Sequence, residues 1–138
     1  MSKERIIKNI RTYIKSNCMK LNHKDFILGD ILYNNRCHLN SVQKVKMGKA
    51  SKIYLCYVID KDNEHSMVHF INQLENGKYQ DNTLGWIYQT YNYYVIKEVN
   101  ETEYDTIWNV LTNTKEDLLA HNSNWFDRNI LKITKEII

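Results

Sequence analysis

The sequence predicts an α+β fold in which helices pack on a central antiparallel sheet, with residues 1–138 forming a single domain. Three observations predict this class. Residues 51–59 are apolar on both alternating faces, as in a strand at the centre of a sheet. The pair Asn76-Gly77 separates two strand-like runs and is a strong hairpin signal. Apolar residues recur at helical spacing in two segments before the central strand, so helices flank the sheet.

The chain before the central strand contains two predicted helices separated by a loop. Residues 5–17 form a packing helix whose core face contains Ile6, Ile7, Ile10, Tyr13 and Ile14. Residues 23–33 are loop-like around a short apolar piece, 26–28. The second helix begins at Cys37, where asparagines are candidate caps, and stops near Gly48. Its predicted buried stripe contains Leu39, Val42 and Val45.

The chain after the central strand is predicted to add three strands. Residues 67–74 and 78–84 form the two arms of the hairpin. Residues 91–99, rich in Tyr and Val, form another strand.

Helices are predicted to follow the last strand. Asn100 or Thr102 caps one that runs through Leu111. Its core face is predicted to contain Tyr104, Ile107, Trp108 and Leu111. A short helix follows from Thr114 to near His121, and residues 128–138 suit a helix better than a strand.

Cys37, His69 and Asp81 occur in the order, and on the kinds of element, that a thiol-dependent acyl-transfer site needs. The positive end of a helix, together with a cationic imidazole, lowers a cysteine pKa from about 8.5 toward about 4 to 7. Cys37 at a helix start would therefore be the nucleophile, His69 the base and Asp81 its orienting partner. The structural alternatives are an inert core thiol, a satisfied core histidine and an aspartate that ends its strand.

The turn of the hairpin decides whether His69 and Asp81 can meet. A two-residue turn at Asn76-Gly77 places them on opposite faces of the sheet and excludes a dyad. A type I turn with Gly77 in the left-handed position as a bulge instead pairs Leu74 with the residue after Gly77. His69 and Asp81 then share a face as diagonal neighbours with Cβ atoms roughly 7 Å apart. The catalytic interpretation therefore requires the bulged register.

The same residues resemble a known family. His69-Phe70-Ile71-Asn72, followed by the segment from Asn76 to Trp86 and preceded by Cys37, is similar to the histidine strand, turn and Asp-x-Thr strand of transglutaminase-like cysteine proteins. These are a branch of the papain-like superfamily, and the resemblance covers about residues 34–86. It implies a papain- or transglutaminase-like core with the nucleophile at a helix N-terminus. It also implies a cysteine hydrolase or acyltransferase that acts on an amide or other acyl bond of a peptide or protein, without a cofactor or metal.

Several nearby residues could complete such a site. The backbone N–H of Cys37 and a side-chain amide of Asn34 or Asn22 are candidate donors to an oxyanion. Trp86 is a candidate for the wall of the substrate cleft, with core packing as its alternative. His38 points about 100° away from Cys37 around the helix, so a surface or capping role is expected for it.

Two other functions compete with the enzyme. A zinc site could use His65 and His69, but no pair of closely spaced cysteines supports it. A catalytically inactive binding or inhibitor protein could engage a host protein through an aromatic surface formed by Tyr88, Tyr91, Tyr93 and Tyr94. The richness in Asn, Lys and Ile and the absence of Pro indicate a low-GC genome, such as that of a virus or mobile element.

Composition and charge limit the partners. The net charge of +3 is small and scattered, which argues against nucleic acid as the main partner. A local basic stretch, interpreted as a solvated helix face, contains Lys44, Lys46, Lys49 and Lys52. No apolar run approaches 18 residues and no secretory signal is present, so no membrane partner is expected. The three cysteines are an odd number and are not spaced like those of a disulfide framework, which fits a reducing compartment. We therefore expect a cytoplasmic protein. The oligomeric state is not encoded in these patterns.

Overall fold

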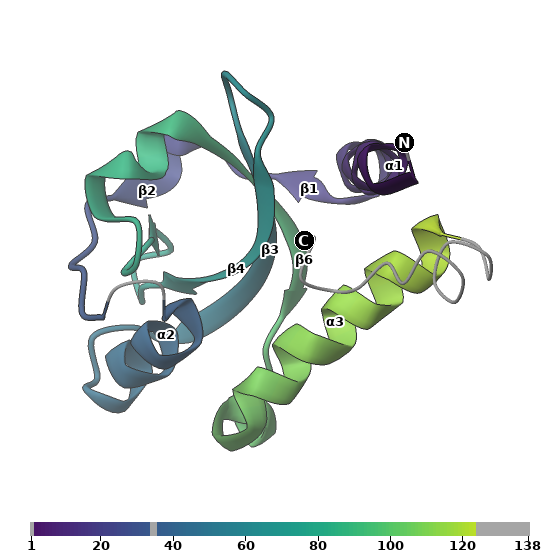
Figure 1. Ribbon diagram of the computed structural model, residues 1–138. Coiled ribbons are helices and arrows are strands. Elements are labelled where there is room, and N and C mark those ends of the chain that lie inside the picture. The colour runs from purple at the N-terminus through teal and green to yellow at the C-terminus, as the bar shows by residue number, and fades with distance from the viewer. Residues whose placement is uncertain (1, 34–35, 124–138) are drawn as a thin grey trace.

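The computed structural model describes residues 2–33 and 36–123, which form one curled sheet with helices packed against it (Figure 1). The helices are α1 (Ser2–Asn17), α2 (Cys37–Lys46) and α3 (Ile107–Asn122). The strands are β1 (Met19–Lys20), β2 (Phe26–Ile27), β3 (Lys52–Asp60), β4 (Ser66–Gln73), β5 (Tyr79–Gln80) and β6 (Tyr91–Glu98). Three short 3-10 helices, η1 (His23–Asp25), η2 (Gly85–Thr90) and η3 (Glu101–Thr106), connect them. No helix in the described ranges combines the length and apolarity needed to cross a membrane.

The sheet has the strand order β1-β6-β3-β4-β5-β2, with β3 near its centre as predicted. β3 pairs antiparallel with β4 and β6, β1 pairs antiparallel with β6, and β5 pairs antiparallel with β4. The exception to the predicted antiparallel sheet is the edge, where β2 runs parallel to β5. That strand is two residues long, too short to carry a periodicity from which its pairing could be predicted.

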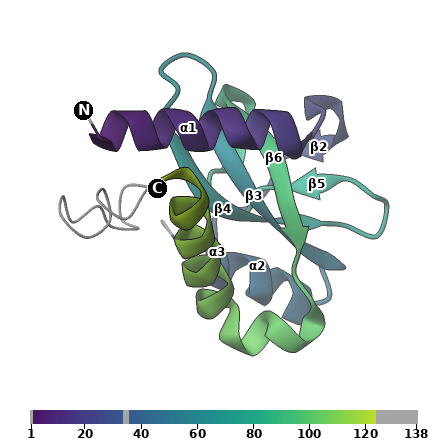
Figure 2. The same ribbon diagram turned by 90° about the vertical axis from the view of Figure 1, so that its right-hand side faces the viewer.

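The three helices share one hydrophobic core with one face of the sheet. That core joins Ile6, Ile10 and Ile14 of α1 to alternate residues of β3 and to buried side chains of α2 and α3. α1 and α3 lie on the same side of the curled sheet and therefore appear in front of it in the turned view (Figures 1 and 2). A second, smaller core on the other face contains Leu21, Phe26, Cys56, Val58, Ile71 and Tyr93.

The predicted strands 51–59, 67–74 and 91–99 are confirmed within one residue at either end, and the predicted helix 5–17 is confirmed but begins three residues earlier. The predicted strand 78–84 is wrong after Gln80. Its chain turns away because the Asp81 carboxylate accepts the backbone N–H groups of the residues two and three positions later, as in an Asx turn.

The two helices predicted between 100 and 121 are also corrected. η3, which follows the capping residue Asn100, precedes the single helix α3. Val110, Leu111, Leu118 and Leu119 are all buried, so core packing continues through the weak helix formers 112–114. The predicted element at 128–138 lies outside the described residues.

Four predicted side-chain environments are wrong. Tyr13 was expected on the core face of its helix but is 39% exposed. Leu39 and Trp108 were expected in the core but are 40% and 57% exposed. Lys44 was expected on a solvated face but is 3% exposed and lies 3.1 Å from the Asp30 carboxylate. The face of α2 toward the sheet contains the polar residues Asn40, Ser41 and Lys44 beside Val42. Hydrophobic periodicity alone therefore misplaces the buried face of this helix.

Candidate active site

Cys37 is the first residue of α2, as predicted, and it is partly exposed. Arg36 occupies the N-cap position without a side-chain capping hydrogen bond. The backbone N–H groups of the first turn have no acceptor within a helix, so the Cys37 N–H is available to a ligand. Asn34, the other oxyanion candidate, lies outside the described residues.

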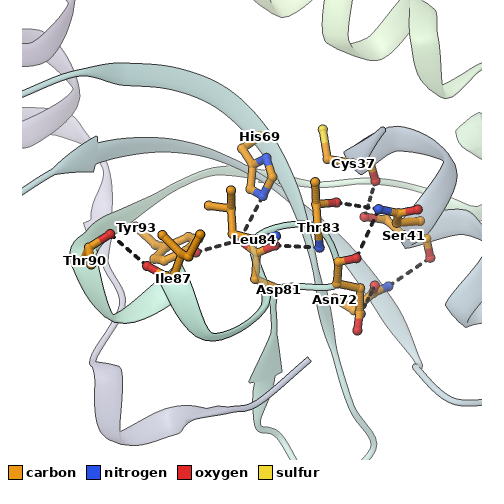
Figure 3. Close-up of polar contacts among 12 residues, drawn as sticks. Cys37, Ser41, His69, Asn72, Asp81, Thr83, Leu84, Ile87, Thr90 and Tyr93 are labelled. Atoms are coloured by element: carbon orange, nitrogen blue, oxygen red, sulfur yellow. Dashed lines mark hydrogen bonds and ion pairs between the residues drawn. The ribbon is translucent and has the colours of Figure 1, made fainter. Parts of the chain in front are cut away.

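The hairpin adopts the bulged register that the catalytic interpretation requires. Gly77 has a φ of 84°, and the Leu74 N–H donates to the Lys78 carbonyl at 2.8 Å. The same register pairs Asn72 with Gln80. His69 and Asp81 consequently meet: His69 Nε2 lies 2.8 Å from Asp81 Oδ2 (Figure 3). His69 and Asp81 were expected to be diagonal neighbours on two paired strands. In the structure only His69 lies in a strand, and Asp81 lies in the turn that follows β5, because β5 ends at Gln80.

The Asp81 carboxylate is fully buried and is held in one orientation. Its Oδ1 accepts the N–H groups of Thr83 and Leu84 at 2.9 and 2.8 Å. Its Oδ2 accepts the Tyr93 hydroxyl at 2.6 Å in addition to the imidazole. Burial raises the pKa of Asp81, but the imidazolium and these donors outweigh it and lower the pKa below its ordinary value. The carboxylate is thus a fixed anion behind the histidine ring.

The surroundings of Cys37 and His69 shift their pKa values in opposite directions. Burial by itself raises the pKa of Cys37, but the charge of His69 and hydrogen bonds from His38, His69 and the Phe70 backbone lower it to about 6. Burial by itself lowers the pKa of His69, but Asp81 and Cys37 raise it to about 10. Because Nε2 faces Asp81, the other ring nitrogen, Nδ1, is the one available to the sulfur. The proton therefore resides on the histidine at neutral pH.

The pair forms beside an open stretch of β4. β5 pairs only with Asn72 and Gln73 of β4, and among the described residues no other strand pairs with β4 on that side. The start of α2 lies there, and the Phe70 backbone contributes its hydrogen bond to the Cys37 sulfur. Without this gap in the sheet, a neighbouring strand would separate the thiol from the histidine.

His38 was expected at the surface or in a capping role, away from the thiol, and this expectation is wrong. Its side chain lines the same cavity as Cys37, and its polar interaction with the sulfur helps to lower the pKa of the thiol. Its ring meets the Trp108 ring edge-on, with centroids 5.1 Å apart. This contact joins α2 to α3, and no periodicity within α2 could have predicted it.

The pair opens into a cavity of about 440 Å³, the size of a small-ligand pocket. Its lining residues are Cys37, His38, Met67, Val68, His69, Thr83, Leu84, Tyr91, Trp108, Leu111 and Lys115. Trp86 is not among them, and at 68% exposure it is not in the core either, so both predictions for Trp86 are wrong. Trp108 and Tyr91, not Trp86, are the Trp and Tyr side chains that line the cavity.

A buried network of three asparagines connects the nucleophile helix to the aspartate segment. The Asn40 side-chain amide donates to the Asn82 carbonyl at 3.0 Å, and the Asn82 amide donates to Asn72 Oδ1 at 2.9 Å. Asn72 in turn donates to the Ser41 carbonyl of α2 at 3.0 Å. The exposures of these asparagines are 0%, 2% and 0%. Sequence analysis missed this network, although asparagine is disfavoured in strands and Asn72 lies near the end of β4.

Other candidates are placed away from the site. Asn22 caps η1, where its side chain accepts the Lys24 N–H. Tyr93 and Tyr94, expected on an adhesive surface, are 0% and 7% exposed. Cys56 is a buried core thiol, as expected. No cluster of three or more His, Cys, Asp or Glu residues that could hold a metal ion occurs in the part of the chain that the structure describes.

Comparisons with known proteins leave the family open. No family model, no curated protein and no solved structure matches this chain.

Proposed function

We propose that the protein is a cysteine-dependent hydrolase or acyltransferase, with Cys37 as nucleophile, His69 as acid and base, and Asp81 as the residue that orients His69. The observation that carries the proposal is a buried carboxylate 2.8 Å from an imidazole, together with a thiol that lines the same open cavity as that imidazole. The order of these residues and their elements also agrees with the resemblance to transglutaminase-like cysteine proteins, which we retain as part of the proposal.

The reaction begins at the ion pair. The Cys37 thiolate attacks the acyl carbon, a C–S bond forms, and the carbonyl electrons move onto oxygen. The Cys37 N–H in the first turn of α2 is positioned to donate to that oxyanion. As the tetrahedral intermediate collapses, the bond to the leaving amine or alcohol breaks and His69 transfers its proton to the leaving group. The product of this half-reaction is an acyl thioester on Cys37.

The second half-reaction restores the enzyme. His69, now neutral, removes a proton from water or another acceptor as that acceptor attacks the thioester carbon. The C–S bond then breaks, Cys37 leaves as a thiolate and His69 is again an imidazolium. Asp81 keeps its negative charge throughout, because the histidine is always the better base in this pair. A thiolate enzyme needs its cysteine reduced, and all three cysteines are free thiols, so we also propose a reducing compartment.

The test is acylation by a simple activated ester. 4-Nitrophenyl acetate should release nitrophenolate in a burst and leave one acetyl group on Cys37, located by peptide mass spectrometry. Cys37→Ala should abolish the burst, whereas the matched control Cys18→Ala should keep it. Equal labelling of Cys18 in the wild type, or a burst that survives Cys37→Ala, would overturn the proposed nucleophile.

A second candidate function, a binding protein without chemistry, is favoured by one observation. Leu28, Ile31 and Trp86 are 62%, 50% and 68% exposed. Their segments are held together by hydrogen bonds from Asp30 and Leu32 to Asn82. Exposed apolar side chains on neighbouring segments can form a protein-binding surface. A folded protein whose Cys37 stays unacylated would favour this function over the enzyme.

A further inference from the structure

One wall of the cavity is a single stripe of α3. Trp108, Leu111 and Lys115 follow one another at intervals of three and four residues, so they share a helix face. Met67 and Val68 of β4 also line the cavity. The stripe spans about two helical turns, or about 10 Å, from an aromatic ring at one end to an ammonium group at the other. Between its two ends the stripe is apolar.

The lining of the cavity has a net positive charge. No Asp or Glu occurs among the lining residues, and Asp81 is fully buried behind His69. The Cys37 thiolate and the His69 imidazolium cancel one another. Lys115 therefore gives the lining a net positive charge, whatever the charge of His38.

Lys115 has no partner that explains its position. The residues three and four positions away on its own helix are Leu111, Thr112, Leu118 and Leu119, none of which is acidic. No ion pair or hydrogen bond engages its side chain within residues 2–33 and 36–123. An uncompensated cation that lines a pocket attracts an anionic ligand.

From these observations we infer that the acyl substrate carries an anionic group, such as a carboxylate, which binds Lys115 while an apolar portion contacts Leu111 and Trp108. This inference rests on the proposed function and adds to it the charge of the substrate. Lys115 is a specificity residue in this scheme: it binds the substrate and takes no part in bond making.

The test compares two alkylating reagents of nearly equal size at Cys37. Iodoacetate is an anion and iodoacetamide is neutral, so the ratio of their rate constants reports the field at the sulfur. Lys115→Met should lower the iodoacetate rate about five-fold at low salt and leave the iodoacetamide rate within about two-fold. Lys115→Arg should retain the wild-type ratio. The control Lys24→Met, at an exposed lysine outside this cavity, should also retain it.

The outcomes separate this inference from the proposed function. If Cys37 reacts with iodoacetamide with an apparent pKa near 6 but Lys115→Met leaves the iodoacetate to iodoacetamide ratio unchanged, the anionic substrate is refuted and the nucleophile stands. If Cys37 reacts with neither reagent in the folded protein, both are refuted. An equal loss of the ratio in Lys24→Met would likewise refute a specific role for Lys115.

Discussion

Asp81→Asn is expected to convert Cys37 from a thiolate into an ordinary thiol. The asparagine oxygen can keep the N–H bonds of the following turn, so its NH₂ group must face His69 and Tyr93. That group can only donate, whereas Asp81 Oδ2 accepts from both His69 and Tyr93. The amide therefore favours a neutral His69, and burial, which lowers the pKa of this histidine, is no longer opposed by the carboxylate.

The size of the effect follows from the two pKa values of the thiol. With a pKa of about 6, Cys37 is about 90% thiolate at pH 7. With the value of 9.0 for an ordinary cysteine, it would be about 1% thiolate at that pH. The iodoacetamide rate at pH 7 should therefore fall by roughly a hundredfold. Replacing one member of a buried ion pair should also destabilise the fold by about 3 to 5 kcal/mol.

The assay is the pH dependence of Cys37 alkylation, read by peptide mass spectrometry at a temperature where circular dichroism shows the variant to be folded. Tyr93→Phe is the matched control, because it removes one hydrogen bond from Asp81 Oδ2 and leaves the carboxylate in place. It should change the rate far less than Asp81→Asn. A folded Asp81→Asn protein whose Cys37 still titrates near 6 would refute the electrostatic argument for the triad.

Four further predictions test the supports of the site. Gly29→Ala should lower both the melting temperature and the alkylation rate of Cys37, because a Cβ on Gly29 would lie 2.1 Å from the Asp81 carbonyl oxygen; unchanged values would show that the contact is not required. Asn72→Ala should cost about 2 to 4 kcal/mol in urea unfolding, because it removes two buried donor bonds and the acceptor of a third; a loss below about 1 kcal/mol would contradict this. Cys56, at 0% exposure with a pKa raised by burial, should react with iodoacetamide only after urea unfolds the protein, and native-state labelling would contradict its place in the core. Stability should fall in acid, because the pKa of Asp81 in the folded protein lies below its ordinary value of 3.8. The ionised carboxylate therefore stabilises the fold above pH 3.8, and this contribution is lost as the pH falls through the pKa of the folded state. Melting temperatures of the wild type and Asp81→Asn in acid measure the difference.

Local patterns determined much of this structure. The apolar spacing of α1 and β3 predicted both elements, because a 3.6-residue period and a run that is apolar on both faces each fit one kind of structure. The helix start at Cys37 was also predicted. For the hairpin, the sequence allowed two pairing registers, and only the bulged one, which the structure adopts, would bring His69 and Asp81 together.

Tertiary structure decided the rest, because it depends on contacts between residues distant in the chain. The Asx turn at Asp81 ended a strand that its sequence would have continued, and the gap beside β4 let α2 approach His69. His38 lines the cavity beside Trp108, a residue of another helix. The sequence by itself therefore determined which residues could form a site and on which elements they lie. Only the folded arrangement decided the burial, partners and charge of each side chain, since those quantities are properties of neighbours that no single segment contains.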